Sequence, residues 1–351
     1  MAPDPSRSTG STTTVQVIGD LTAIEPIAAP WDALVDPRRS VRAFASPLVF
    51  LAWCRLRPAA TPRVFTAWHG ERLVGVLPLW RTEDDLRLQF PGNLSDGNDV
   101  VVVEGPSGQG DVGVARALYE AAHHEGPLLL RCLPEDALLL EVANTQPTGS
   151  PRSTAVPQRV GTVQCPHIDL RLGFDAYLAT RSSKFRTRLR RFLRKADEHG
   201  LQVGELRPDR LAPQTLPQLF LDLHLERIPT SAFTDVENRR HVEQTLPPLF
   251  EQGAYRVFAV LRPEAPHSRP VDPGDVLALG VCVRTPRGLG LWNGGFRTEA
   301  TSFSPGRVLI HAELQAACAE GAEEFDFLRG GERYKEDWCT GRRWLGHWEV
   351  D

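Results

Sequence analysis

The stretch from Leu289 to Gly331 constrains the fold of this chain more than any other. Leu289 to Gly295 alternates around a tryptophan, which is typical of a strand. The small polar residues from Thr298 to Ser304 predict a loop, and the apolar residues after Pro305 recur at roughly helical spacing. A second short strand is predicted from Glu324 to Leu328. This succession of strand, loop, helix and strand is typical of an α/β domain.

The start of the predicted helix is a candidate anion-binding site. Ser304 suits the N-cap, and Pro305 suits the first helical position, where its missing N–H costs no hydrogen bond. A helix N-terminus presents free N–H groups and the positive end of the helix dipole. Gly306 would let a ligand approach the backbone closely, and Arg307 adds a positive charge. The turn therefore predicts a cradle for a diphosphate. The alternative is an ordinary capped helix.

Composition narrows the class of protein. The 351 residues allow one large or two medium domains, and the net charge of −4 is unexceptional. No apolar run is long enough to span a membrane. Residues 1–14 lack the apolar core of a signal peptide, so we expect a disordered tail. The six scattered cysteines contain no CxxC pair, which predicts buried thiols in a reducing cytoplasm and no metal site.

The order of the apolar segments repeats along the chain, which indicates duplication of one α/β unit. The later segments Pro217–Ile228, Tyr255–Leu261 and Leu277–Val283 echo the earlier segments Pro47–Leu56, Arg63–Trp68 and Leu73–Leu77, in that order. We therefore predict a first half over residues 15–145, a linker rich in Pro, Ser and Thr over 146–165, and a second half over 166–351. Chance similarity is the alternative, because matches of three residues are common.

A basic amphipathic helix is predicted between the halves, from Arg181 to Lys195. Its apolar residues, Phe185, Leu189, Phe192 and Leu193, fall on one face. Its candidate anion-binding residues are Lys184, Arg186, Arg188, Arg190, Arg191 and Arg194. Runs of like charge are usually solvated faces. The functional alternative is an anionic partner: a phosphorylated cofactor, a nucleic acid or a lipid surface.

Four pieces of the sequence together resemble the GNAT superfamily, and more closely its CelD/BcsL-type acetyltransferase branch. They are the hairpin end Leu73–Leu79, Ser95-Asp96 followed by Asp99, the helix start Ser183–Arg186, and Ser304-Pro305-Gly306 leading on to Phe327–Trp338. The last piece is the most specific, and the resemblance spans roughly residues 30 to 345. This branch is similar to the FemA/FemB/FemX aminoacyltransferases, which are built from two GNAT-like halves.

The resemblance and the internal echo predict the fold. We expect an α/β (α+β) protein of two tandem GNAT-like halves, each a mixed, mostly antiparallel sheet flanked by helices. The donor site is expected in the second half, and the last ~15 residues are expected to pack back on the first half.

The resemblance implies transfer of an acyl group from acyl-CoA, such as acetyl-CoA, to an amine or hydroxyl of a small-molecule or saccharide acceptor. In the family, the loop before the long helix holds the diphosphate of coenzyme A, and the matching loop here is Phe303 to Val308. This loop departs from the superfamily pattern Q/R-x-x-G-x-G/A in either register of Gly306. Fem-like enzymes take an aminoacyl-tRNA instead, which would give the basic helix an RNA partner. An inactive GNAT-like binding module is the alternative from another class.

Acyl transfer needs few side chains. Backbone N–H groups on a splayed strand would polarise the donor carbonyl, and Trp292, Asn293 and Gly294, followed by Gly295, are the candidates. A general base would deprotonate the acceptor amine. The candidates are Asp96, Asp99, His224, Glu226 and Glu332, with turn formation by the aspartates and surface placement of the helix residues as alternatives. Tyr334 and Lys335 follow a strand end, where α/β sites tend to lie. Lys335 is a candidate to bind a phosphate or the substrate, and the alternative is a surface lysine.

Overall fold

The structure is a computed structural model that describes residues 12–36, 41–105, 109–145, 156–267 and 269–351. Its first half contains β1 (Thr13–Ile18), α1 (Leu21–Ile24), the 3-10 helix η1 (Glu25–Ile27), α2 (Ala28–Leu34), α3 (Arg42–Ala45), α4 (Pro47–Leu56), β2 (Thr61–His69), β3 (Arg72–Arg81), β4 (Leu88–Gln89), β5 (Val101–Val102), α5 (Val112–Glu125), β6 (Leu128–Pro134) and α6 (Leu138–Asn144).

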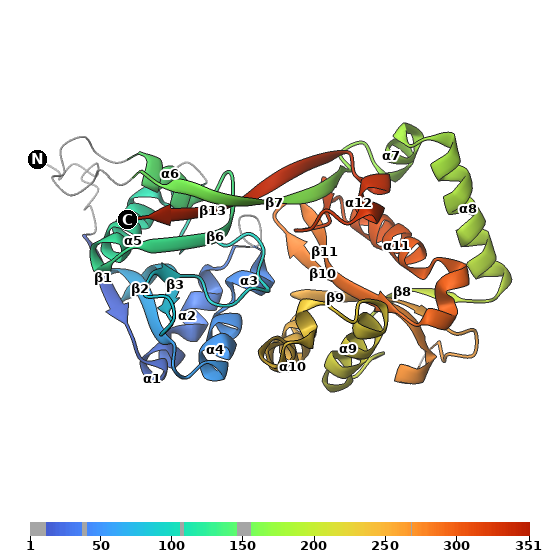
Figure 1. The fold of residues 1–351 in the computed structure, drawn as a ribbon, viewed down its shortest axis with the longest axis horizontal. Coiled ribbons are helices and arrows are strands. Elements are labelled where there is room, and N and C mark those ends of the chain that lie inside the picture. Colours follow the sequence, from blue (N-terminus) through green and yellow to red (C-terminus); the bar gives the residue numbers. More distant parts are fainter. Residues whose placement is uncertain (1–11, 37–40, 106–108, 146–155, 268) are drawn as a thin grey trace, which may run out of the picture.

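The rest of the chain contains β7 (Gln158–Asp169), α7 (Phe174–Thr180), α8 (Ser183–Glu198), β8 (Gln202–Leu206), η2 (Pro213–Thr215), α9 (Leu216–Arg227), η3 (Ala232–Thr234), α10 (Val236–Glu251), β9 (Tyr255–Leu261), η4 (Pro273–Asp275), β10 (Val276–Thr285), β11 (Gly288–Phe296), η5 (Thr298–Phe303), α11 (Pro305–Ala319), β12 (Glu324–Asp326), α12 (Arg333–Trp338) and β13 (Gly341–Val350). Apart from the long strands β7 and β13, which reach across both, the two groups of elements form the left and right parts of the molecule (Figure 1).

The two halves repeat one strand order. The continuous sheet begins with the strands β1-β2-β3-β4-β6 at one edge and ends with β12-β11-β10-β9-β8 at the other. Counted from each outer edge inward, the two sets of strands therefore follow the same chain order. The parallel pairs occupy equivalent places, β4 with β6 and β11 with β12, and the other pairs are antiparallel. A helix, α5 or α11, precedes the last strand of each set. The predicted fold of two tandem GNAT-like halves is therefore confirmed.

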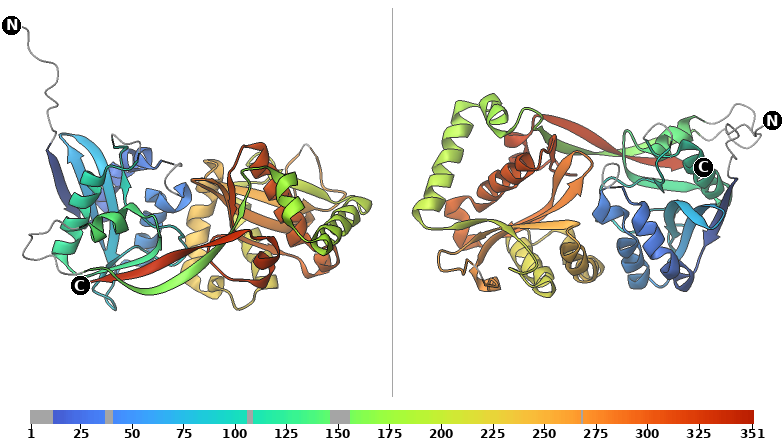
Figure 2. Two further views of the ribbon diagram at one scale, coloured as in Figure 1. Left: turned by 90° about the horizontal axis from the view of Figure 1, so that it is seen from above. Right: turned by 180° about the vertical axis from the view of Figure 1, so that it is seen from behind.

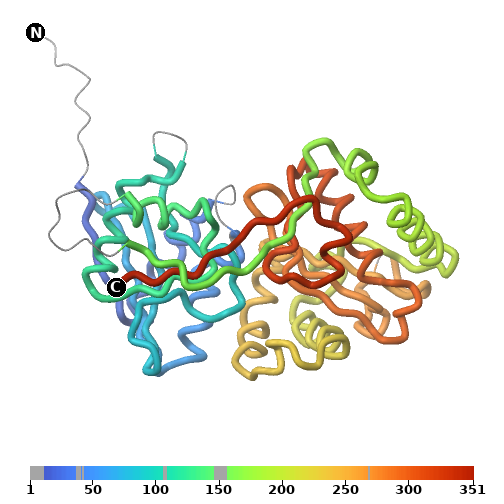
Figure 3. The backbone as a smooth tube through the Cα atoms, turned by 45° about the horizontal axis from the view of Figure 1, so that its top comes forward, coloured from blue at the N-terminus to red at the C-terminus, as the bar shows by residue number. Residues whose placement is uncertain are grey.

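Two long strands join the halves. β7 and β13 run side by side along the top of the molecule (Figures 1 and 2). β13 pairs with β6 of the first half, and β7 pairs with β12 of the second. The tube view shows the C-terminal end lying against the first half (Figure 3). A single sheet thus passes through both halves, because β6, β13, β7 and β12 are consecutive neighbours in it.

This joint changes two of the predicted boundaries. Residues 158–165, predicted as linker, form the first part of β7, and residues 146–155 lie outside the described residues. Thr13 and Thr14, predicted as part of a disordered tail, open β1, and residues 1–11 are not described. The composition of residues 146–165, rich in Ser and Thr, indicated a linker. The pairing of residues 158–165 with the distant strand β13 overrides this local preference.

Helices cover both faces of the sheet. α5 and α6 cover one face of the first half, and α7, α8 and α11 cover the corresponding face of the second. α2 and α4 of the first half and α9 and α10 of the second share one apolar core. At that junction Trp53 on α4 stacks on His241 on α10, with ring centroids 4.1 Å apart. None of the helices in the described residues is long and apolar enough to cross a membrane.

Local sequence signals account for several element boundaries. Ser46 caps α4 through its bond from the Leu48 N–H, and Asp111 caps α5 through the Val114 N–H. The stretch from Thr298, predicted as a loop, is instead the 3-10 helix η5. Ser304 is the N-cap of α11, as predicted, but its side chain makes no capping bond and its φ is 54°.

Gly295 provides a test of how α9 packs on β11. A Cβ at this position would lie 2.3 Å from the Leu223 carbonyl carbon, so the helix backbone has to move if a side chain is added. We expect Gly295→Ala to reduce the free energy of unfolding by about 1–3 kcal/mol. The measurement is thermal unfolding followed by circular dichroism. Gly204→Ala on β8 is the matched control, because its Cβ position has no atom of the described residues within 4 Å. Equal melting temperatures for the two variants would contradict the packing.

Candidate active site

A loop of the first half meets a segment of the second. Arg329, which follows β12, places its Nε 2.8 Å from Oδ1 of Asp96, in the loop after β4. The same guanidinium donates to the Asn93 carbonyl. Asp96 is 4% exposed, and burial raises the pKa of its carboxyl despite the nearby Arg329 and Lys335 charges. The contact therefore puts a buried, charge-balanced carboxylate at the boundary between the halves.

Lys335 holds the segment that carries Arg329. It is 4% exposed, and its Nζ donates to the carbonyls of Phe327 and Arg329, both at 3.0 Å. Its third partner is Oε2 of Glu332, the N-cap residue of α12, at 2.8 Å. The Tyr334 ring meets the Phe327 ring edge to face. Lys335 is thus neither a surface lysine nor a free phosphate ligand, because its three N–H donors are used by the protein.

Backbone strain concentrates at these segments. Three non-glycine residues in the described part of the chain have positive φ: Cys132 at 57°, Leu328 at 52° and Ser304 at 54°. Cys132 and Leu328 flank the contact between the halves, and Arg329 donates to the Cys132 sulfur at 3.7 Å. Ser304 begins α11. Such conformations cost free energy and collect at functional sites, so all three positions mark candidate sites.

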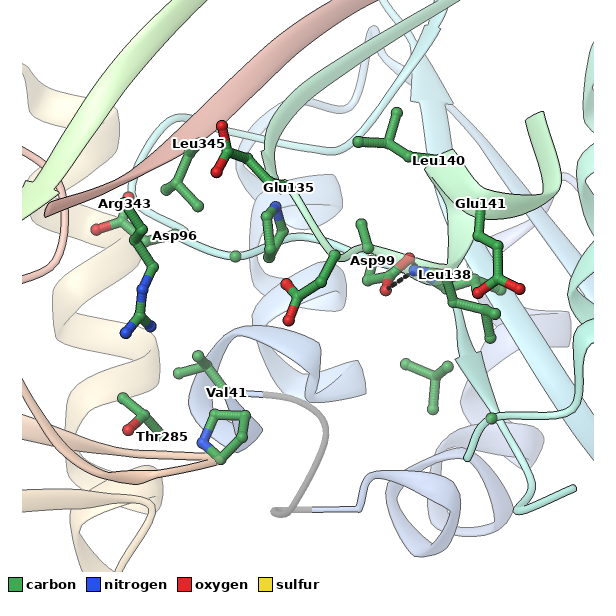
Figure 4. A pocket seen from close by; sticks show the side chains of 18 of the residues that line it. Val41, Asp96, Asp99, Glu135, Leu138, Leu140, Glu141, Thr285, Arg343 and Leu345 are labelled. Atoms are coloured by element: carbon green, nitrogen blue, oxygen red, sulfur yellow. Dashed lines mark hydrogen bonds between the residues drawn. The ribbon is translucent and has the colours of Figure 1, made fainter. Parts of the chain in front are cut away.

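A cavity of about 690 Å³ lies between the halves. One wall carries Asp96 and Arg343, and the opposite wall carries Asp99, Leu138 and Glu141 (Figure 4). Asp326 and Leu328, at and just beyond the end of β12, also line it, as do residues 285–287 of the β10–β11 turn. Its volume is in the range of small-molecule sites. Asp96 is therefore accessible to a small ligand from a space that both halves enclose.

The carboxylate of Asp99 binds backbone N–H groups of the protein itself. Its carboxylate accepts hydrogen bonds from the N–H groups of Leu138, Leu139 and Val100, at 2.7, 3.0 and 2.8 Å. It thereby caps α6, although its carboxyl lines the cavity. Burial raises the pKa of Asp99 to about 6, and the three amides act in the opposite direction.

His224 and Glu226, on α9, also bind backbone. His224 is buried, its Nδ1 lies 2.9 Å from the Gly294 carbonyl oxygen, and burial lowers its pKa. Glu226 accepts from the Thr298 N–H at 2.6 Å, which lowers the pKa of its carboxyl and fixes η5. Neither residue lines the cavity. The structure does not bring them to Asp96 and Lys335.

The candidate donor strand, β11, separates from β12. Their ladder covers only Gly288–Gly290 opposite Glu324–Asp326. Beyond it, a bulge at Trp292 interrupts the pairing of β11 with β10. Asn293 and Gly294 follow the bulge, on the part of β11 that β12 does not pair. Bulges next to a separated strand edge are common beside active sites.

The residues around this bulge pack against other parts of the protein. The Trp292 ring lies against Phe220 and Phe233, and its Nε1 donates to the Leu94 carbonyl of the first half at 3.2 Å. A Cβ on Gly294 would lie 2.7 Å from the Leu279 carbonyl oxygen. Gly294 therefore allows the neighbouring strand β10 to pack closely. The sequence had instead indicated that a ligand approaches the backbone here.

The N-terminus of α11 is open on one side. No atom of the described residues lies within 4 Å of a Cβ built on Gly306. Pro305 lacks an N–H, however, and the Arg307 N–H already donates to the Ser304 carbonyl at 2.9 Å. The Arg307 side chain pairs with Asp337 at 2.5 Å. Among residues 305–307, Gly306 is therefore the residue whose backbone N–H can still bind a ligand.

The predicted basic amphipathic helix is α8, and it packs beside α11 and η5. Phe185 and Leu189 are buried, as the periodicity indicated. Of its cations, Arg186 binds the Arg181 carbonyl, Arg188 pairs with Asp337, and Arg194 lies 3.4 Å from Glu198. Lys184, Arg190 and Arg191 are exposed and pair with no acidic residue among those described. They form a cationic edge on the second half.

Sequence reasoning missed Arg329, Asp326, Arg343 and Asp337 as site residues. Arg329 and Asp337 lie inside the segment Phe327–Trp338 that carried the resemblance, so the signal was present. Asp326 and Arg343, 3.2 Å apart, are brought together by the pairing of β12, β7 and β13. No local pattern predicts that pairing. The described residues contain no group of three or more His, Cys, Asp or Glu side chains that could hold a metal ion.

Comparison with known proteins bears on the domain type and on the fold. Residues 183–336, from α8 into α12, match the family model described as an acetyltransferase (GNAT) domain. FemX has a similar structure, with a TM-score of 0.51 at 12% identity over 85% of this chain and 90% of that one. L-PGS from Bacillus licheniformis has a TM-score of 0.55 at 12% identity, over 95% and 91%. No curated protein matches the sequence.

The identities are low, so the two structures establish the fold, whereas the family model establishes the domain type. The residues that match this model include β11, with its bulge, and the segment held by Lys335. The second half of this chain therefore contains a GNAT acetyltransferase domain, over residues 183–336, and the fold of the chain is similar to those of FemX and L-PGS.

Proposed function

We propose that this protein transfers an acyl group from a donor held by the second half to an amine bound in the cavity between the halves. The supporting observation is the position of β12. This strand leaves β11 at Asp326, so a donor carbonyl can reach the unpaired edge of β11. Asp326 and Leu328 at the same strand end line the cavity. Donor and acceptor sites would then meet at the end of β12.

The chemistry follows from the groups present. Backbone N–H groups of residues 292–294 would polarise the acyl carbonyl, and the acceptor nitrogen would attack its carbon. A new amide bond forms as the donor's ester or thioester bond breaks, and the oxygen or sulfur of the carrier takes up a proton and leaves as the free hydroxyl or thiol. Asp96 lines the cavity, and its raised pKa makes it a stronger base than an exposed aspartate, so it would accept the proton that the amine loses. Arg329 would position Asp96, and Lys335 would position Arg329.

Two donors remain as candidates, and the features of α8 and α11 favour aminoacyl-tRNA. A CoA diphosphate is typically bound by several amides of one helix turn, but here Pro305 has no N–H and the Arg307 N–H is occupied. The exposed cations of α8 provide a surface for a longer phosphate chain. The Fem-like resemblance and the FemX-like fold point the same way. Acyl-CoA is the second candidate, supported by the acetyltransferase family model and by the open face of Gly306.

The donor can be identified by thermal stability, because a ligand that binds only the native state raises the melting temperature. We expect aminoacyl-tRNA to stabilise the protein more than deacylated tRNA does. Acetyl-CoA at millimolar concentration should give a smaller shift. The reverse order would assign acyl-CoA as the donor. If neither ligand changes the melting temperature, the inactive binding module becomes the better reading.

The cations of α8 give a second test. We expect the triple variant Lys184→Gln, Arg190→Gln, Arg191→Gln to weaken tRNA binding about tenfold or more at low salt, because each lost cation leaves a phosphate contact unmade. Its dependence on salt should also become shallower. Filter binding at several salt concentrations measures both. The control replaces Arg55, Arg72 and Arg116 of the first half by Gln; equal weakening by the control set would show non-specific attraction.

Lys335 tests the site itself. We expect Lys335→Ala to lower kcat by about 100-fold or more, since the loop that carries Arg329 loses its clamp. The KM for the donor should change little. Steady-state kinetics measures both, with circular dichroism as the check on folding. Lys335→Arg keeps the charge but not the geometry and should recover part of kcat. Unchanged turnover in a folded Lys335→Ala protein would remove this residue from the site.

A further inference from the structure

Glu313 is a buried carboxyl that the proposed chemistry does not use. It lies in the middle of α11 and is 0% exposed, and neither of its side-chain oxygens accepts a hydrogen bond from the described residues. Burial raises the pKa of its carboxyl from 4.5 to about 8, and the thiol of Cys282 on β10 acts in the opposite direction. The carboxyl of Glu313 is therefore mainly protonated and neutral at pH 7.

The charged groups of the neighbouring elements do not offset this burial. Arg256 on β9 pairs with Glu205 on β8 at 2.7 Å. It affects the pKa of the Cys282 thiol and not that of Glu313. The cations of α8, which packs beside α11, do not affect the pKa of Glu313 either, and β11 contains no charged residue. From α12, the phenol of Tyr334 faces Glu313, whose charge contributes to the raised pKa of the phenol. An ionised Glu313 would therefore have no positive partner among the described residues.

Gly280 on β10 leaves the space that this carboxyl occupies. A Cβ built on Gly280 would lie 2.2 Å from Oε1 of Glu313, so a side chain at this position would displace the carboxyl. Gly280 is paired with Gly294 of β11, which is one of the candidate residues for binding the donor carbonyl. Glu313 therefore packs α11 against the sheet directly beside the donor strand.

We propose that Glu313 positions the donor site through its proton: α11 lies closely on β10 while the carboxyl is neutral, and loss of the proton separates the two elements and weakens donor binding. An unpaired carboxylate is unfavourable in this apolar contact, so α11 moves away from Gly280 or water enters. The N-terminus of α11 carries Gly306, and the strand paired with Gly280 carries Gly294. Such a movement therefore alters both parts of the donor site. The effect on donor binding rests on the proposed function, whereas the proton of Glu313 does not.

Thermal unfolding at several pH values tests the proton without any substrate. Between pH 4.5 and 8 the native carboxyl is protonated and the unfolded one is ionised, so unfolding releases a proton and stability falls as the pH rises. Glu313→Gln keeps the shape of the side chain and cannot ionise. We expect its melting temperature to exceed that of the wild type by several degrees at pH 8 and by much less at pH 5. An equal difference at both pH values would overturn the inference.

Gly280→Ala tests the contact itself. In the wild type the added methyl group meets the carboxyl of Glu313 and should lower the melting temperature, whereas in a Glu313→Ala background the space is vacant and the loss should be smaller. Gly204→Ala on β8 is the control and should have the same small effect in both backgrounds. Equal losses from Gly280→Ala in both backgrounds would contradict the contact.

Kinetics separates positioning of the donor site from stability alone. If only the neutral form binds the donor, the KM for aminoacyl-tRNA should rise about fourfold between pH 7 and 8.5 in the wild type, as a group with a pKa of about 8 ionises. The KM of Glu313→Gln should lack this rise, and the ratio of the two kcat values should not change with pH. The same pH dependence of KM in both proteins would overturn the inference.

Amide hydrogen exchange of α11 distinguishes a failure of this inference from a failure of the proposed function. Absence of turnover with every donor would reject the proposed function. Faster exchange of residues 305–319 at pH 8.5 in the wild type than in Glu313→Gln would still support the separation of α11 from β10. Equal exchange in the two proteins at this pH would overturn it.

Discussion

The backbone ladder through β6, β13, β7 and β12 is the constraint on which the rest of this structure depends. A tandem fold can leave its halves free to move, because contacts between domains are often modest. Here the halves share one sheet, so their separation is set by hydrogen bonds between main chains. The loop that carries Asp96 and the segment that carries Arg329 can therefore meet with fixed geometry. A catalytic arrangement made from two halves needs such a fixed distance.

The charges at the boundary are tolerable only as a group. An isolated buried ammonium or carboxylate costs several kcal/mol or more, whereas a paired and hydrogen-bonded one does not. Lys335 binds two carbonyls and Glu332, Arg329 binds Asp96 and the Asn93 carbonyl, and Asp326 accepts from the Leu328 N–H and Arg343. Removing one member leaves another unsatisfied. The set is therefore expected to act as a unit, and its single substitutions should not be additive.

The candidate sites differ in how many of their residues are already used in contacts within the protein. Around the β11 bulge, Trp292, Gly294 and Gly295 are explained by packing against the first half, β10 and α9. At the cavity and on α8, several charged side chains have no protein partner among the described residues. Unused charge in an otherwise satisfied structure is better evidence for a ligand than a glycine in a strand, because glycine has many structural uses.

The sequence by itself determined the units of this protein. Residue periodicity predicted β11, α11, β12 and the basic helix α8 within a few residues, because local spacing decides which face of a helix or strand is apolar. The repeated order of segments predicted two similar halves, and the segment Phe327–Trp338 contained the candidate residue Lys335. Only the tertiary structure decided which of the candidate residues share a site. β7 and β13 pair residues more than 170 positions apart, and no local signal specifies a partner at that distance. That pairing closes the cavity between the halves and leaves His224 and Glu226 outside it.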